Sequence, residues 1–135
     1  MRYDARDHLT QGGHKEWSFE EWQVSLLATE MLLVRIMIAK IENQASLENI
    51  LRSVPLRQGE PGWNCVGWVK EALQLLMAGD KVLGANSVVE WKTVRDIAMS
   101  YCQQKRIQHR FDGKGDFDTE KPATYDLLQE KEVIC

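Results

Sequence analysis

The chain has 135 residues, of which 44% are hydrophobic and 27% charged, with a formal net charge of −3 at pH 7. This composition predicts one folded domain over residues 1–135 and excludes a disordered chain. The weak negative charge and the lack of a long basic run argue against nucleic acid as a partner. Arg35 and Lys40 interrupt the most apolar run, Met31–Ile41, so we expect no membrane span.

The start of the chain lacks the apolar region of a signal peptide, and its cysteines (Cys65, Cys102 and Cys135) are odd in number and widely spaced. Both features predict a reducing, cytoplasmic setting. The cysteines and histidines show no paired metal-ligand spacing, and Gly113–Gly115 lacks the surroundings of a P-loop. We therefore expect neither a metal nor a cofactor.

The first half of the chain contains three distinct segments. Residues 1–16 are polar and predict a loosely structured start. The aromatic and acidic segment Trp17–Trp22 predicts a short strand. Met31–Ile41 is apolar on both faces and rich in β-branched residues, which favours a strand covered on both sides. A helix over Ser25–Lys40 remains the alternative.

Three helices are expected after this strand. Ser46 is the predicted N-cap of a short helix that Pro55 ends. A second helix runs over residues 64–78, with Asn64 as its N-cap and Gly79 as its stop. Its predicted buried face consists of Val66, Val69, Leu73, Leu76 and Met77.

The third helix covers residues 87–106, capped by Asn86 or Ser87, with Glu90 completing a capping box. Residues 112–135 are expected to form an irregular C-terminal segment. Asp112–Glu120 superficially resembles a calcium loop, but Phe117 and Ala123 occupy positions where that loop needs glycine and glutamate. We expect a solvated loop there.

Cys65 is the candidate catalytic residue, because a thiol in the first turn of a helix faces unpaired backbone N–H groups and the positive end of the helix dipole. A nucleophilic cysteine also needs a base. His8 and His14 are the candidates, while His109 follows the third helix. The alternative is that Cys65 is a small apolar residue packed in the core.

Tryptophans surround the same turn. Trp63 and Trp68 flank Cys65, and Trp17 lies in the early strand. Aromatic residues dominate small cores, which favours a packing role for Trp68. Trp63, Trp17 and Trp68, with Asn64, are nevertheless the candidate binding residues of a pocket for an apolar or aromatic ligand.

Residues from about Trp17 to Phe111 resemble a group of small fungal proteins with no established activity. The matching pieces are Trp17-Ser18-Phe19-Glu20, Leu32–Ile36 with Ala39-Lys40-Ile41, Leu51–Pro55, and above all Asn64-Cys65-Val66-Gly67-Trp68-Val69 with Glu71-Ala72-Leu73. The resemblance implies a strand for Met31–Ile41.

More distantly, an Asn-Cys pair that opens a helix is similar to thiol hydrolases and acyltransferases of the papain-like and lecithin–retinol-acyltransferase type. On that resemblance Cys65 attacks an acyl carbonyl, a histidine on a nearby strand acts as the base, and the Cys65 backbone N–H helps to bind the oxyanion. Asp4 stands where the fungal group has a histidine, and aspartate is too weak a base for this role. The resemblance also implies that an N-terminal hairpin is missing, which would expose a sheet edge for homodimerisation.

Together these observations predict an α+β fold: a small antiparallel sheet with Met31–Ile41 as its central strand, packed by the helices over 64–78 and 87–106, with a papain-like core. The leading function is thiol-dependent hydrolysis or acyl transfer on a small-molecule or peptide substrate. One alternative is a non-catalytic binding or scaffolding protein. Another is a fungal biosynthetic enzyme that uses an aromatic pocket without covalent catalysis.

Overall fold

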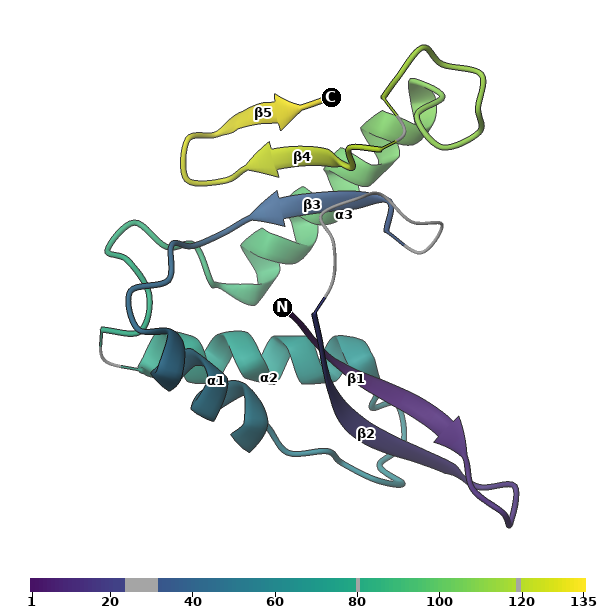
Figure 1. Cartoon of the computed structure of the whole chain (residues 1–135), viewed down its shortest axis with the longest axis vertical. Coiled ribbons are helices and arrows are strands. Elements are labelled where there is room, and N and C mark those ends of the chain that lie inside the picture. Colours follow the sequence, from purple (N-terminus) through teal and green to yellow (C-terminus); the bar gives the residue numbers. More distant parts are fainter. Residues whose placement is uncertain (24–31, 80, 119) are drawn as a thin grey trace. The chain divides into compact units, whose positions relative to one another are not determined.

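The computed structural model describes residues 1–23, 32–79, 81–118 and 120–135 (Figure 1). Along the described residues a run of strands is followed by a run of helices and then by two more strands, and this separation of helices from strands confirms the α+β class. The elements are β1 (Arg2–Leu9), β2 (Lys15–Trp22), β3 (Val34–Met37), α1 (Gln44–Ser53), α2 (Cys65–Ala78), α3 (Trp91–Ile107), β4 (Ala123–Asp126) and β5 (Lys131–Ile134).

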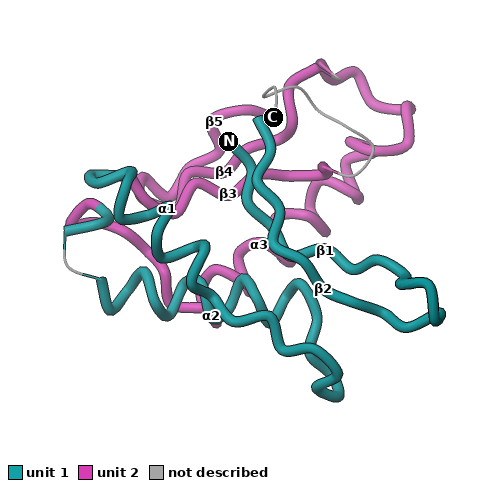
Figure 2. Tube along the Cα trace, turned by 60° about the horizontal axis from the view of Figure 1, so that its bottom comes forward, with its two compact units in different colours: residues 1–24, 41–83 teal, residues 25–40, 84–135 magenta. Residues whose placement is uncertain are grey.

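The chain divides into two units, shown in different colours in Figure 2. Unit 1 consists of Met1–Val24 and Ile41–Leu83, and unit 2 of Ser25–Lys40 and Gly84–Cys135. The expectation of one domain over residues 1–135 stays a prediction.

Unit 1 begins with a β-hairpin in which β1 pairs antiparallel with β2. The strand predicted for Trp17–Trp22 is confirmed, but the expectation of a loose start over residues 1–16 is wrong, because most of that segment is β1 and its turn. Tyr3 and Ala5 alternate with charged residues and supply the apolar face that this strand needs. Residues 2–22 thus form a hairpin.

The hairpin packs on α1 and α2 to form the core of unit 1. Ala5 is 5% exposed and belongs to a buried cluster with residues of both helices and of the segments that follow them. The helices supply Leu47, Leu51, Trp68, Ala72 and Leu76, and the following segments supply Val54 and Val82. A bidentate ion pair also joins β2 to α1, with Arg52 Nε 2.5 Å and Arg52 Nη2 3.1 Å from the two Glu21 carboxylate oxygens. The Arg52 hydrogen bond lowers the pKa of Glu21.

The ends of α2 are as predicted. The Asn64 side chain caps the helix, and the Gly79 N–H closes it by donating to the carbonyls of Leu75 and Leu76. The cap of α1 differs: Ser46 donates its N–H to Asn43 Oδ1 at 3.1 Å, so Asn43 is the N-cap. Asparagine and serine both favour the N-cap position, so the residue types alone did not distinguish Asn43 from Ser46, three residues later.

The buried face of α2 is rotated from the one predicted. Trp68, Ala72 and Leu76 lie in the core of unit 1, at a spacing of four residues. The predicted burial is wrong for Val66, Val69 and Met77, which are 49%, 40% and 55% exposed, and it is confirmed for Leu73 and Leu76. The helix carries apolar residues around most of its circumference, and periodicity alone therefore could not choose the face.

Unit 2 contains a mixed sheet with the strand order β3-β4-β5. The strand predicted at Met31–Ile41 is shorter, covering Val34–Met37, and residue 31 lies outside the described residues, as does much of the alternative helix over 25–40. This strand, β3, was also predicted to be central in its sheet. That prediction is wrong for the described strands, because β3 is an edge strand and β4 is the central one. β3 pairs in parallel with β4, since the chain returns through α3 before β4 begins.

α3 starts at Trp91 with Glu90 as its N-cap, four residues later than predicted. Lys105, 1% exposed, forms an ion pair with Glu132 of β5, and the Tyr101 hydroxyl donates to the same carboxylate at 2.7 Å. These contacts help to order residues 123–134 as β4 and β5, so the irregular segment predicted for 112–135 is wrong over that stretch. No helix among the described residues has the length and apolar character needed to cross a bilayer.

Candidate functional site

Cys65 is exposed and is the first residue of α2. Two of the backbone N–H groups at this helix start, those of Val66 and Gly67, donate to Asn64 Oδ1 at 3.0 and 3.4 Å. The Asn64 amide oxygen therefore occupies donors that a thiolate or an oxyanion would otherwise use. The helix start is well capped, and the sulfur lies beside it at the surface rather than in the core.

Trp63 and Trp17 form an aromatic pair next to this turn. Their ring centroids are 5.3 Å apart and the rings are nearly perpendicular, at 88°. This is a favoured edge-to-face geometry. Both side chains are half-buried, so each indole contributes to the core and to the surface of unit 1.

Gln58 holds Trp17 in place. The Trp17 N–H donates to Gln58 Oε1 at 2.8 Å, and Gln58 Nε2 donates to the Trp17 carbonyl at 2.6 Å. The side-chain amide thus pairs with the strand as a residue of a neighbouring strand would. This clamp ties the loop after α1 to β2 and fixes the position of the Trp17 indole.

Gly67 makes room for Trp63. A Cβ atom built at Gly67 would lie 2.9 Å from Trp63 Cδ1 and 3.0 Å from Nε1, closer than such contacts normally allow. The indole therefore packs directly against the backbone of the first turn of α2. Glycine is unfavourable inside a helix, so its presence here indicates a packing requirement.

A second aromatic layer lies behind this pair. Phe19 contacts Trp68 with ring centroids 5.9 Å apart, and Tyr3 stacks on Phe19 at 6.3 Å. The Tyr3 hydroxyl donates to Glu48 at 3.1 Å, and burial, with this hydrogen bond, raises the pKa of Tyr3. Trp68 is 3% exposed and serves as core, whereas Trp63 and Trp17 reach the surface.

Three polar atoms in this region are buried without a hydrogen-bond partner among the described residues: Trp63 Nε1, Trp68 Nε1 and Glu71 Oε2. Buried indole N–H groups and carboxylate oxygens usually have partners. The other Glu71 oxygen accepts from Arg57 Nε at 2.6 Å, and that hydrogen bond raises the pKa of Arg57. All three atoms are buried, so a ligand could reach them only if the surrounding side chains moved.

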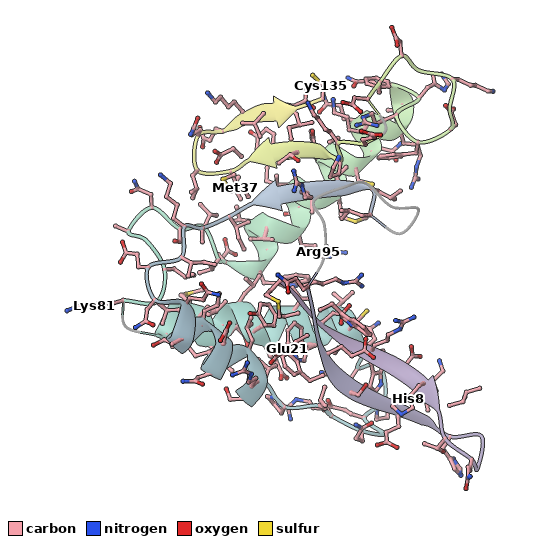
Figure 3. The ribbon with its side chains drawn as sticks, viewed as in Figure 1. His8, Glu21, Met37, Lys81, Arg95 and Cys135 are labelled. Carbon is pink, nitrogen blue, oxygen red and sulfur yellow. The ribbon has the colours of Figure 1, made fainter. Side chains whose placement is uncertain are left out.

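The candidate histidines lie elsewhere. Side chains alternate along β1, so His8 lies on the face that carries Asp4 and Arg6, opposite the face of Ala5 that packs on α2. Figure 3 shows His8 towards the turn end of the hairpin. His14 belongs to that turn, where Thr10 N–H donates to the His14 carbonyl at 2.9 Å.

His109 belongs to unit 2, and its Nδ1 lies 2.7 Å from Asp112 Oδ2. This is the one hydrogen bond between described residues that a histidine ring makes. Asp4 shares the outer face of β1 with His8 and pairs with Arg2 at 2.6 Å. The structure thus brings Trp17, Trp63 and Cys65 to neighbouring parts of unit 1, and it does not join a histidine to them by any such bond.

The described residues contain no group of three or more histidine, cysteine or acidic side chains arranged to hold a metal ion. In the loop that superficially resembles a calcium site, Asp112 instead accepts from His109 and from the Lys114 backbone N–H, and these bonds lower the pKa of Asp112.

Sequence reasoning missed Gln58 and Glu71. Neither lies in a recognisable motif, and Gln58 is separated from Trp17 by 41 positions in the sequence. Gly67 was the one local signal, because a glycine inside an amphipathic helix indicates a close approach by another group.

Residues 1–134 match the model of a family of unknown function, DUF6914. The chain belongs to DUF6914. The match spans both units of this DUF6914 protein, so the aromatic site and the sheet of unit 2 lie within the same family region. Neither the comparison with curated proteins nor the comparison with solved structures finds a match.

Proposed function

We propose that the protein is a binding protein whose site is the Trp17–Trp63 pair at the start of α2. The observation that carries this proposal is the fixed edge-to-face geometry of two half-buried indoles, held by the Gln58 clamp and by the close approach to Gly67. Rigid aromatic side chains that lose little entropy on binding are favoured in ligand sites.

The chemistry of the site favours a small molecule or peptide side chain with a planar apolar part and hydrogen-bonding groups at its edge. The apolar part would stack on the indoles. Once the side chains that bury these atoms move aside, an acceptor on the ligand would bind Trp63 Nε1, and a donor would bind the second carboxylate oxygen of Glu71. Arg57 holds the other Glu71 oxygen and keeps the carboxylate oriented.

Site mapping with a planar aromatic probe tests this proposal. Anilinonaphthalene sulfonate (ANS) is titrated into isotope-labelled protein in native buffer while the indole N–H signals are followed by NMR. The proposal expects the signals of Trp17 and Trp63 to shift together and that of Trp22 to stay in place, because Trp22 lies on the opposite face of the hairpin. A shift confined to Trp22 or Trp91 would contradict it.

Thiol-dependent hydrolysis or acyl transfer at Cys65 is the second candidate. Its support is the exposure of the sulfur at the first residue of a helix. His8 and Asp4 lie on the outer face of β1, opposite the face that packs on α2, and this placement favours the binding role. Iodoacetamide labelling at neutral pH separates the two, since exposed Cys135 in the same chain is an internal reference and a nucleophile must react faster than it does.

Two further expectations belong to this proposal. The unpaired cysteines of the described residues support a reducing setting such as the cytoplasm. A homodimer is the other expectation, and sedimentation equilibrium of the unchanged chain tests it.

A further inference from the structure

The two faces of α3 differ in character. The inner face packs on the sheet of unit 2 (Figure 1). There the ring centroid of Tyr101 lies 5.6 Å from that of Tyr125, and buried Lys105 pairs with Glu132. The outer face lies on the opposite side of the helix and makes no such contacts with the sheet.

The outer face of α3 carries three cations and one methionine in a row. Lys92, Arg95, Met99 and Arg106 follow at intervals of three, four and seven positions, which places them on one side of the helix. Lys92 and Arg106 are exposed, the Arg95 side chain is 58% exposed and Met99 is 63% exposed. These four residues, called the α3 stripe below, extend over about 21 Å of helix.

The charges of the α3 stripe are not neutralised among the residues that the structure describes. Lys92 and Arg106 form no ion pair there. Arg95 has Asp96 at 3.9 Å, and a contact between two exposed side chains at that distance is worth little. Asp96 is also the single acidic residue of α3, against four basic ones, in a chain with a net charge of −3. Positive charge is thus concentrated on α3 against the overall balance of the chain.

We propose that the α3 stripe is an interaction surface for an acidic segment of another protein. The partner that fits it carries carboxylates on both sides of an apolar side chain. The carboxylates pair with the cations, and the apolar side chain packs on Met99, which lies between them. Basic clusters recognise acidic motifs in this way, and a methionine adapts its shape to the side chain it meets. This inference goes beyond the proposed function and does not use the Trp17–Trp63 site.

The α3 stripe favours a protein over the two other polyanions that a cationic helix can bind. Nucleic acid is held through its phosphates, and an exposed methionine at the centre of the contact adds nothing to that binding. A helix that binds a membrane surface inserts a broad apolar face into the lipid. The apolar face of α3 is packed on its own sheet, with Tyr101 4% exposed, so it is not available for insertion.

Binding of a fluorescein-labelled peptide tests the proposal. The peptide repeats the unit Glu-Leu-Glu, and fluorescence anisotropy measures its affinity at low and at physiological ionic strength. We expect binding that weakens as salt is added, because exposed charges are screened. Two control peptides replace the unit by Gln-Leu-Gln or by Glu-Gln-Glu, which removes the charges or the apolar group. Each control should bind about tenfold more weakly.

Charge reversal locates the surface. Lys92→Glu and Arg95→Glu each place an acidic group in the first half of α3, where it does not oppose the helix dipole, so we expect folded variants that bind the peptide about tenfold more weakly. Lys114→Glu makes the same change of net charge at an exposed loop position of unit 2 and should bind normally. Trp63→Ala should also bind normally, so a failure of the aromatic site and a failure of the α3 stripe are distinguishable.

Three results would overturn the proposal. The first is a loss of peptide binding in Lys114→Glu as large as that in the stripe variants, because net charge alone would then explain the binding. The second is tighter binding to duplex DNA, or to vesicles that contain phosphatidylserine, than to the peptide. The third is a homodimer of the unchanged chain that Arg95→Glu dissociates, since a second copy would then occupy the α3 stripe.

Discussion

Gln58 completes β2 at Trp17 by pairing with both the N–H and the C=O of that residue, at 2.8 and 2.6 Å. A loop side chain thus does two things. It blocks one strand edge, and it holds one indole of the proposed binding site. The hairpin and the aromatic site depend on the same contact.

Replacing Gln58 by Ala should loosen this arrangement. The two lost hydrogen bonds lie at the surface, where water replaces them, so we expect a loss of about 1 kcal/mol in the free energy of unfolding. The environment of Trp17 should change as well, seen as a shift in tryptophan emission. Gln103→Ala, at an exposed position of α3, is the matched control. Equal effects of the two substitutions would contradict the role of the clamp.

The Asn64 cap is the second target. Asn64→Ala removes the acceptor for the Val66 and Gly67 N–H groups, and we expect a loss of about 1 kcal/mol in urea unfolding. Asn64→Asp keeps an acceptor oxygen at the same place and should retain most of the stability. If the alanine and aspartate variants unfold alike, the cap does not stabilise α2 as described.

Gly67→Ala is expected to change the site more than the stability. The added methyl group meets Trp63 at 2.9 Å and must displace the indole, while alanine itself favours the helix by about 1 kcal/mol over glycine. The two effects oppose each other in the free energy of unfolding. The Trp63 indole N–H signal should therefore move in an NMR spectrum of a protein that remains folded. An unchanged Trp63 signal would show that the close contact is absent.

Glu132 makes the stability of unit 2 dependent on pH. Burial raises the pKa of this carboxyl, but hydrogen bonds from Lys105 and Tyr101 and the Lys105 charge outweigh burial, and the folded pKa lies below its ordinary value. A carboxyl with a lowered folded pKa contributes stability above its unfolded pKa of about 4.3 and loses it as the pH falls through the folded pKa.

Glu132→Gln should therefore destabilise the protein at pH 7 and have progressively less effect as the pH falls below about 4. Chemical unfolding of both proteins across this range measures the difference, and exposed Glu130→Gln is the control. A difference that stays constant with pH would rule out the ionised Glu132 as its source.

Local signals in the sequence predicted some features and could not predict others. Asn64 and Gly79 bound α2 as expected, because a cap and a helix stop act within one turn. β1 escaped prediction because a strand in a two-stranded ribbon needs only a few apolar residues, and here Tyr3 and Ala5 suffice beside many charged neighbours. Its partner strand was predicted from Trp17 and Phe19, which are more strongly apolar.

The features that were not predicted depend on contacts between elements that are distant in the sequence. The core face of α2 was misjudged because Val66 and Met77 are as apolar as the residues that pack in the core. The position of the histidines relative to the thiol depended on strand parity: His8 falls on the outer face of β1 only because Ala5 falls on the inner one. The packing of the strand decides which of its two faces is buried. A strand that mixes apolar and charged residues carries no local signal for that choice.

The most direct test of the proposed binding role compares ANS affinity among three single variants. The account predicts that Cys65→Ala and Trp22→Ala bind the probe as the unchanged chain does, while Trp63→Ala binds it about tenfold more weakly, because the indoles and not the sulfur form the site. Loss of binding in Cys65→Ala with full binding in Trp63→Ala would contradict it.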